Sequence, residues 1–362
     1  MVNIIKLFDP AVDAREEVVL KKILQSHFWS SGLGHGNVSK FEKEFKKFTG
    51  SSECVAVNSG SAALHLAVSL LKIRDKEIIL PSLTFVSTAH AITLNGGKPV
   101  FVDIDPNTLC IDPELIKRAI SKKTKAIIPV HFGGMAANLK EINEICKENQ
   151  IEMVEDAAHA TGTIYNKKRI GSHGFAVCHS FNPTKNLVMP NGGAITLNGK
   201  NSKKLKKMLN SRRWCGITNR VDKKYNVEEL GWNYFMNEFS AAMGLVQLKK
   251  INKLISKRKK IAKRYFKEIK TEKKMPFDKD CAYHLFWIQV KNRTEFMKLM
   301  LKNGIETGIH FIPIHKMKIY RNDIKLKNTE EASSRIVSLP MNTNLSDDDV
   351  SYVINSVNKF AK

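Results

Sequence analysis

Residues 151–185 read IEMVEDAAHATGTIYNKKRIGSHGFAVCHSFNPTK, and polar side chains lie in this stretch at or shortly after the ends of two apolar runs. A short apolar run ends in Asp156, and a second apolar run leads to Ser180 and Lys185. Both runs have the length and composition of buried strands. In a parallel sheet, ligands bind beyond the carboxyl ends of the strands. We therefore expect these three side chains to share one site with His159, which follows the first run closely.

Strand-like and helix-like runs alternate along the first two thirds of the chain. The other strand-like runs lie at residues 54–57, 78–80, 99–104, 125–134 and 192–198. Helical patterns follow the first four of them. This alternation favours an α/β fold with a mostly parallel central sheet flanked by helices.

The pattern changes from about residue 200, where a basic helix leads into a polar loop at residues 216–237. The helical stretch 238–269 then carries small and apolar residues on one side and Lys and Arg on the other. Such a helix can lie at a membrane surface, but its apolar first half favours a helix that crosses between domains. We expect an N-terminal arm at residues 1–36, a large domain at 37–248 and a smaller C-terminal α/β domain at 249–362.

A turn of small residues, Asn58-Ser59-Gly60-Ser61, joins the strand-like run 54–57 to an apolar helix. The first N–H groups of a helix have no partner within the helix, and its dipole attracts negative charge. The turn is therefore suited to a phosphate group. A plain N-cap by Ser59 or Ser61 is the alternative, and the sequence leaves both interpretations open.

Phe85 lies just beyond the strand-like run 78–80. An aromatic ring at that end of a strand could stack on a flat ligand. The alternative is a phenylalanine of the hydrophobic core, which is the commoner environment of this residue type.

The groups that follow the two central runs suit an aldehyde cofactor, pyridoxal phosphate (PLP). Its aldehyde needs a reachable and partly deprotonated amine, for which Lys185 is the candidate. Its pyridine nitrogen needs a carboxylate, for which Asp156 is the candidate, with His159 close by. The phosphate would bind at Ser180 and at the Gly60-Ser61 turn. A solvent-exposed loop lysine is the alternative interpretation of residue 185.

Composition sets the outer limits. The 362 residues carry a formal net charge of +24, which we interpret as a solvated surface that could favour anionic substrates; no nucleic-acid-binding signature accompanies it. The six Cys residues lack metal-ligand spacing, and no signal peptide or membrane span is evident, so we expect a cytoplasmic protein with reduced thiols. For the neighbouring His310 and His315 we expect a binding-loop or packed role, and no metal site.

The order of the motifs resembles the fold-type I, PLP-dependent nucleotide-sugar aminotransferases of the DegT/StrS group, over nearly the whole chain. The motifs that carry this resemblance are SGLGHGNVSKFEKEF, NSGSAALHLA, LPSLTFVSTAHAI, PVFVDIDPNTL, IPVHFGG, VEDAAHATG, HSFNPTKN, GWNYFMNEFSAAMGLVQLKKI, IHFIPIH and VSLPMNTNLSDDDV. The resemblance implies a large PLP-binding domain and a small C-terminal domain, as in aspartate aminotransferase.

The resemblance also implies roles for single residues. Lys185 would bind the cofactor and move the proton, Asp156 would pair with the pyridinium nitrogen, and His159 would lie near the ring oxygen. The phosphate would bind at Gly60, Ser61 and Ser180, and Phe85 would stack on the ring. Asn233 would reach the phosphate of the neighbouring subunit, which implies a homodimer with shared active sites. The residues implied on the substrate side are His310, His315 and Asn342.

The reaction implied is amino transfer from L-glutamate to a nucleotide-linked 4-keto- or 3-keto-6-deoxy hexose, for polysaccharide or glycan synthesis. The chain differs from the sequence that is usual in the family at two places. One is Met189-Pro190-Asn191, and the other is Asn342, where many members have His. Both places lie on the substrate side. The alternatives are a keto sugar or cyclitol without a nucleotide, a dehydratase, which Lys185 argues against, and a non-catalytic regulator that binds DNA.

Overall fold

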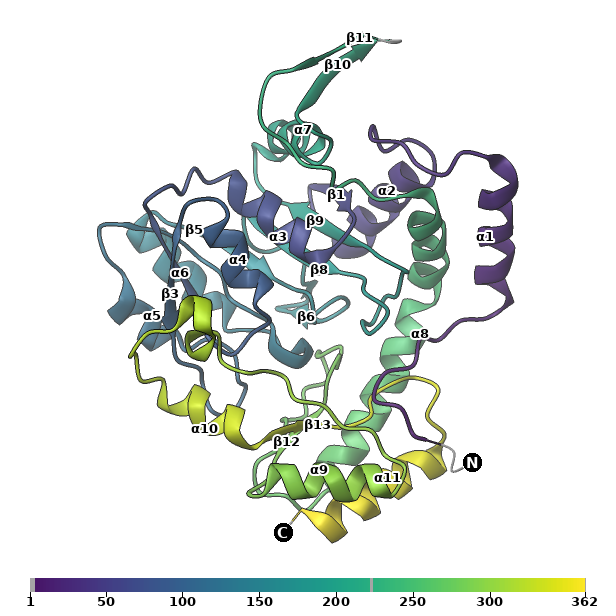
Figure 1. The fold of residues 1–362 in the computed structure, drawn as a ribbon, viewed down its shortest axis with the longest axis vertical. Coiled ribbons are helices and arrows are strands. Elements are labelled where there is room, and N and C mark those ends of the chain that lie inside the picture. The colour runs from purple at the N-terminus through teal and green to yellow at the C-terminus, as the bar shows by residue number, and fades with distance from the viewer. Residues whose placement is uncertain (1–3, 222–223, 362) are drawn as a thin grey trace.

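The computed structural model describes residues 4–221 and 224–361, and its centre is a seven-stranded sheet (Figure 1). The strands are β1 (Glu53–Val57), β2 (Glu77–Pro81), β3 (Lys98–Val102), β4 (Thr124–Ile127), β5 (Glu152–Asp156), β8 (Ala176–Ser180) and β9 (Gly193–Leu197). They are ordered β1-β9-β8-β5-β4-β2-β3. Strand β9 is antiparallel to both of its neighbours, and the remaining neighbouring pairs are parallel. The mostly parallel sheet expected from the sequence is confirmed.

Helices cover both faces of this sheet, which explains why its strands are apolar at nearly every position. Ile78 of β2 belongs to a buried cluster with α3, α4 and α7, whereas the next residue, Ile79, belongs to a cluster with α5 and α6. These helices are α3 (Gly60–Ser69), α4 (Ser87–Thr93), α5 (Pro113–Ala119), α6 (Leu139–Asn149) and α7 (Ser202–Arg212). The 3₁₀ turn η1 (Phe132–Gly134) follows β4.

The N-terminal segment spans the molecule. Ile5 pairs with Ile305 of the C-terminal part, and α1 (Ala14–Ser26) packs on the long helix α8 (Glu238–Glu268). Helix α2 (Asn37–Thr49) packs against α8 and against β1, which is the strand at one edge of the sheet. Helix α8 therefore contacts the arm, the sheet layer and the C-terminal lobe, as expected for a helix that crosses between parts of the molecule.

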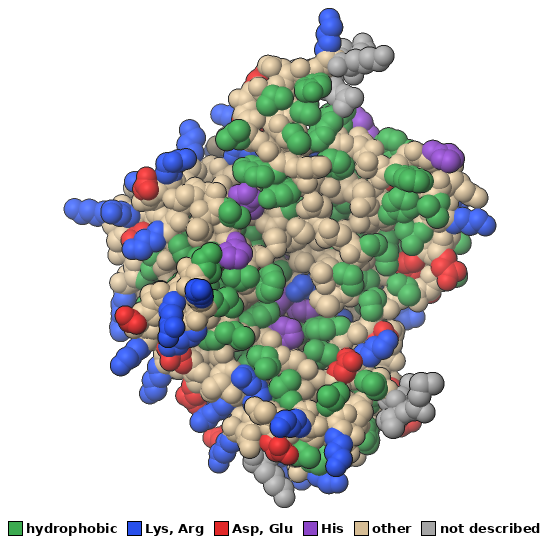
Figure 2. All heavy atoms as spheres, in the orientation of Figure 1, with side chains coloured by type: hydrophobic (Ala, Val, Ile, Leu, Met, Phe, Trp, Pro, Cys, Tyr) green, Lys and Arg blue, Asp and Glu red, His purple; other side chains and the backbone are tan. Residues whose placement is uncertain are grey.

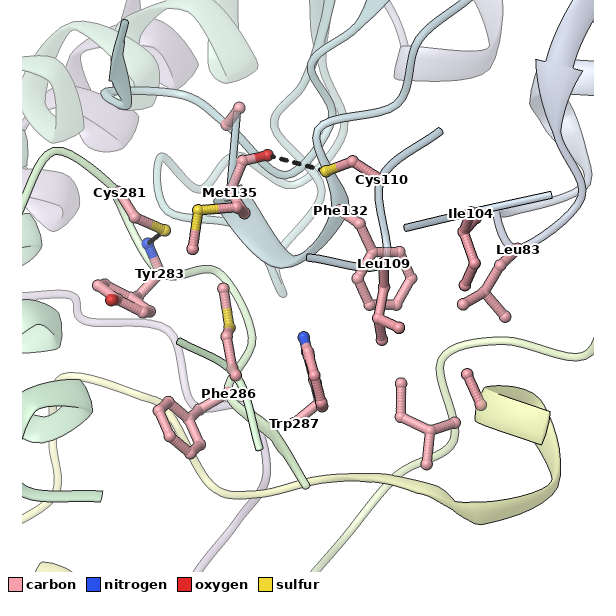
Figure 3. Packing of buried hydrophobic residues seen from close by; sticks show 14 of the residues in the cluster. Leu83, Ile104, Leu109, Cys110, Phe132, Met135, Cys281, Tyr283, Phe286 and Trp287 are labelled. Carbon is pink, nitrogen blue, oxygen red and sulfur yellow. Dashed lines mark hydrogen bonds between the residues drawn. The ribbon is translucent and has the colours of Figure 1, made fainter. Parts of the chain in front are cut away.

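The C-terminal lobe shares its core with the large sheet. It contains β12 (Trp287–Gln289), α9 (Arg293–Lys302), η2 (Ile314–Lys316), η3 (Lys318–Tyr320), α10 (Lys327–Arg335), β13 (Ile336–Ser338) and α11 (Asp347–Phe360). Trp287 and Phe286 of this lobe lie in one buried cluster with Phe132 and Ile104 of the sheet layer (Figure 3). The boundary predicted between residues 248 and 249 falls within α8, and the division into domains stays a prediction.

Segment 216–237, which was expected as a polar loop, contains a hairpin, so that this expectation was wrong. Strands β10 (Ile217–Val221) and β11 (Lys224–Val227) project from the body beyond α7 (Figure 1). All four residues of β11 are exposed, and an exposed strand needs no apolar alternation. The short pair β6 (Ile164–Tyr165) and β7 (Lys168–Arg169) was not expected either. In the described part of the chain, no helix is both long enough and apolar enough to cross a membrane.

Candidate active site

A cavity of about 320 Å³ opens at the carboxyl ends of the central strands. Its wall contains most of the residues singled out in the sequence: Gly60, Ser61, Phe85, Asp156, His159, Ser180, Lys185 and His310. Histidine side chains and a basic side chain are visible in a hollow near the middle of the face shown in Figure 2. The groups that follow the central runs therefore lie together in the wall of one cavity, and their roles there stay predictions.

Lys185 is held in the cavity wall and is not a solvent-exposed loop lysine. Its backbone N–H donates to the carbonyl of Asn182 at 2.9 Å, and the next side chain, Asn186, donates to the carbonyl of Ala282 at 3.1 Å. Burial lowers the pKa of the Lys185 amine to about 8, although the carboxylate of Asp156 acts in the opposite direction. A substantial fraction of the amine is therefore neutral near physiological pH.

Asp156 is a buried carboxylate at the end of β5. It accepts hydrogen bonds from the Thr88 hydroxyl at 2.7 Å and from the backbone N–H of Ala158 at 3.1 Å. Burial raises the pKa of the carboxyl group, while these hydrogen bonds and Lys185 lower it. Within residues 4–221 and 224–361 the carboxylate forms no ion pair, so a cationic ligand group would relieve its desolvation.

His159 is neutral in this site, because burial and the nearby Lys185 lower the pKa of its imidazole well below the usual range. The backbone N–H of Gly133 points at Nδ1 at 3.3 Å, which assigns the ring proton to Nε2. The ring stacks on Phe311, with centroids 5.8 Å apart and planes inclined by 25°. His159 is therefore a fixed hydrogen-bond donor in an aromatic setting.

The Asn58-Ser61 turn contains the N-cap that was one of the two interpretations, and phosphate binding there stays a prediction. Ser59 is the N-cap of α3, since its hydroxyl accepts from the N–H of Ala62 at 3.1 Å. Gly60 and Ser61, one residue further, line the cavity. A Cβ atom on Gly60 would lie 2.7 Å from Cβ of Ser180, so this glycine leaves room that any other residue would fill. The concave helix start has the shape and polarity of an anion site.

Phe85 is 56% exposed, and it lines the cavity. The alternative that it belongs to the hydrophobic core is therefore wrong. Its ring lies 6.1 Å from that of Phe311, centroid to centroid. The two rings form an aromatic part of the wall against which a flat ligand could pack.

Three of the residues singled out in the sequence lie outside the cavity wall. His315 is buried, with Nδ1 2.7 Å from the Ser82 hydroxyl and Nε2 3.3 Å from Glu330. Asn342 is also buried, and its side chain donates to the carbonyl of Lys6 at 2.7 Å. Asn233 is exposed, pairs through its backbone with Trp214, and accepts a hydrogen bond on its carbonyl from the Asn58 side chain at 3.3 Å. Within one chain, the side chains of these three residues are not part of the cavity wall.

Sequence reasoning missed His284 and Phe8, which both line the cavity. The Nε2 atom of His284 lies 3.4 Å from Nζ of Lys185, and its ring stacks on that of Phe8 at 5.6 Å. His284 lies in a strand-like run outside the central sheet and Phe8 lies in the arm, so neither follows a strand-like run of that sheet. Asn191, in the segment that departs from the family wording, also lines the cavity, whereas Met189 is buried in the core.

The chain matches one family of known proteins over nearly its whole length. The DegT/DnrJ/EryC1/StrS aminotransferase family matches residues 10–358. An uncharacterised protein of Methanocaldococcus jannaschii is 36% identical over 345 residues, which are 88% of this chain and 89% of that protein.

Solved structures cover almost the full length of the chain. PseC of Helicobacter pylori, an aminotransferase involved in the biosynthesis of pseudoaminic acid, is 26% identical, with a TM-score of 0.93 over 99% of each chain. Spr1654 of Streptococcus pneumoniae, described as a sugar aminotransferase, was solved in a PMP form. It is 25% identical over 99% of this chain and 98% of that chain, with a TM-score of 0.93. The same protein was also solved in a PLP form, with a TM-score of 0.92.

Proposed function

Because this chain belongs to the DegT/DnrJ/EryC1/StrS family of PLP-dependent aminotransferases, we propose that it transfers an amino group from L-glutamate to a nucleotide-linked keto sugar. The cavity supports the proposal, since it combines a partly neutral amine, a buried carboxylate and a helix N-terminus. PseC and Spr1654, whose descriptions name an aminotransferase of pseudoaminic acid biosynthesis and a sugar aminotransferase, support a sugar acceptor. The single observation that carries the proposal is the position of Lys185 beside Asp156 in this cavity.

The residues present fit PLP. We propose that its phosphate binds at Gly60 and Ser61 of α3 and at Ser180, where the missing Cβ of Gly60 leaves a concave surface. Asp156 would face the pyridinium nitrogen, whose positive charge offsets the cost of burying the carboxylate. Phe85 would pack on the ring. When bound, PLP supplies an electron sink that stabilises negative charge on the carbon next to the amino nitrogen.

Lys185 is the proposed catalytic residue. An amine with a pKa of about 8 is protonated in part at neutral pH, so it can both accept and return a proton. His159, neutral and with its proton on Nε2, would donate a hydrogen bond without adding positive charge to the site. Asp156 stays fixed by Thr88 and by the Ala158 N–H while the proton moves.

On the substrate side, His310 is the residue that reaches the cavity. Its Nδ1 lies 2.9 Å from the Ser338 hydroxyl, and burial lowers the pKa of its imidazole to about 4. A neutral ring at this position suits the hydroxyl groups of a sugar. We propose that His315 and Asn342 act on the substrate side by fixing loops, since their side chains are already bonded to Ser82 and to the Lys6 carbonyl.

A second subunit is part of the proposal. Asn233 is exposed in one chain, although the family resemblance assigns it to a phosphate. Large apolar side chains are also exposed on and beside α1, and Figure 2 shows hydrophobic groups on that side of the molecule. They are Val18, Leu24, Phe28, Trp29 and Leu33. An exposed apolar surface of this kind is typical of an interface, and we propose a homodimer with shared active sites.

The test combines trapping with a substrate panel. Reduction of the PLP-loaded protein with borohydride should attach the cofactor to the peptide that contains Lys185, and Lys185→Ala should abolish this attachment. Nucleotide-linked keto sugars, free keto sugars and keto cyclitols are then supplied with L-glutamate, and 2-oxoglutarate is measured. Turnover of the nucleotide-linked sugars supports the proposal. Turnover of the free compounds alone would refute the nucleotide requirement.

A further inference from the structure

His284 contacts the proposed catalytic amine from the C-terminal lobe. Its Nε2 atom lies 3.4 Å from Nζ of Lys185, 99 residues away in the sequence. Its other ring nitrogen, Nδ1, is buried and has no hydrogen-bond partner within the described part of the chain. Nε2 is thus the ring nitrogen of His284 that faces a hydrogen-bonding group, and that group is the Lys185 amine.

The ring of His284 is fixed by two neighbouring rings. Phe8 stacks on it with centroids 5.6 Å apart and planes inclined by 13°, and the ring of His159 lies 4.4 Å away. The backbone is fixed as well, because the carbonyl of His284 accepts from Arg258 at 3.4 Å. Its neighbour Leu285 donates to the carbonyl of Gly133 at 3.1 Å. An imidazole held in this way can fix the position of the amine at the end of a flexible lysine side chain.

The charges around His284 keep it neutral. Burial lowers the pKa of its imidazole well below the usual range, and the neighbouring Lys185, His159, Arg258 and His310 lower it further. The carboxylate of Asp156 acts on Lys185 in the opposite direction, since it raises the pKa of the amine. A neutral imidazole offers a lone pair, which is what an N–H of the amine or ammonium group needs.

We propose that His284 is a positioning residue, which accepts a hydrogen bond from the Lys185 amine through Nε2 and holds that amine at the cavity wall when it is not bound to the cofactor. This inference rests on the proposed role of Lys185. Amino transfer frees the lysine in each half-reaction, and a free four-carbon chain would lose its alignment without an anchor. His284 supplies the anchor from the C-terminal lobe, which contributes none of the PLP-binding residues assigned above.

The proposal predicts the sign of a pKa change. A hydrogen bond from the ammonium form of Lys185 to His284 stabilises the charged form, so its loss lowers the pKa of the lysine. In His284→Leu the midpoint should fall by about one unit, a tenfold change in the ratio of amine to ammonium. His284→Gln retains an acceptor atom at the position of Nε2 and should restore the wild-type midpoint. If His284 were merely a packing residue, its loss would admit water and raise the midpoint towards the ordinary lysine value.

The experiment uses the apoprotein of the full chain. Trace labelling with acetic anhydride across a range of pH, followed by mass spectrometry of the peptide with Lys185, gives the midpoint for the wild type and each variant. His310→Leu is the matched control, because it removes another cavity histidine that makes no hydrogen bond to the lysine; its midpoint should remain within about 0.3 of the wild type.

The outcomes separate this inference from the function itself. If borohydride does not attach PLP to Lys185 in the wild type, the proposed function fails before His284 is tested. If it does, a lower midpoint in His284→Leu with recovery in His284→Gln supports the positioning role. An unchanged midpoint, a raised midpoint, or an equal decrease in the leucine and glutamine variants would overturn it.

Discussion

At the scale of single residues, the site contains an amine that is costly to bury. The pKa of Lys185 is about 8 in the folded apoprotein and higher in the unfolded chain, where the lysine is solvated. Between these two pKa values the unfolded state binds more protons, so the contribution of this group to stability rises with pH. Below pH 8 the buried ammonium destabilises the fold.

Lys185→Met should therefore raise the melting temperature of the apoprotein at pH 7, and the gain should be much smaller at pH 10. Calorimetry of both proteins at the two pH values checks this, since other titrating groups cancel in the difference. Lys257→Met, on the exposed side of α8, is the matched control and should change little at either pH. An equal gain at both pH values would contradict the buried ammonium.

Gly60 offers a second prediction at this scale. Its Cβ would lie 2.7 Å from Cβ of Ser180, so Gly60→Ala should push the helix start away from the phosphate and weaken PLP binding by about tenfold or more. Equilibrium titration of the apoprotein with PLP measures the effect. Gly50→Ala is the control: its φ of 76° makes alanine strained, but no atom lies within 4 Å. It should lower the melting temperature and leave PLP affinity unchanged.

The residues that could be predicted share a local mark. Four of them lie at or shortly after the ends of apolar runs: Asp156, His159, Ser180 and Lys185. Gly60 opens a helix after another run. His284 has no such mark, because it reaches the cavity only when the C-terminal lobe packs on the sheet. A single sequence does not show which strand-like run of a distant lobe turns towards the site.

At the scale of elements, α2 depends on a residue from another helix. No side chain of its own caps its N-terminus, which follows Gly36 at φ 76°. The carboxylate of Glu238, the first residue of α8, accepts from the N–H of Asn37 at 2.7 Å and from that of Val38 at 3.3 Å. The start of α2 is thus fixed to the helix that spans the molecule.

Glu238→Ala should destabilise the protein by about 1–3 kcal/mol, because it removes a buried acceptor from two backbone donors. The matched control is Glu268→Ala at the other end of α8, where the carboxylate is exposed and pairs with Arg264. Its loss should cost less than about 0.5 kcal/mol. Denaturation midpoints in urea measure both, and equal effects would show that Glu238 does not cap α2.

Helices and strands could be predicted where one buried face gives the apolar residues a regular spacing along the sequence. The strands of the large sheet, the helices α3 to α6 that follow four of them, and helices α7 and α8 were expected from the sequence and confirmed. The hairpin of β10 and β11 was missed because exposed strands carry no apolar period, and β6 and β7 are too short to show one. Helix α10 is polar and short, with three buried residues, and was missed for the same physical reason.

At the scale of the whole molecule, the two lobes form a continuous core, and the proposed site lies at their junction. Lys185 comes from the sheet layer, whereas His284, His310 and Phe311 come from the C-terminal part. What one chain does not explain is the side chain of Asn233, which is exposed on the segment that leads from the β10–β11 hairpin to α8. A partner subunit would give this side chain a role.

Mixing two inactive variants tests this arrangement directly. If Asn233 serves the partner's site, a mixed dimer of Lys185→Ala and Asn233→Ala contains one site with both changes and one site with neither. Random exchange of equal amounts should then restore about a quarter of wild-type turnover, because half of the dimers are mixed and half of their sites are intact. If Asn233 serves its own chain, each site of a mixed dimer carries one change and mixing restores nothing. Refolding the two variants together and measuring 2-oxoglutarate, with each variant refolded alone as the control, decides between the two arrangements.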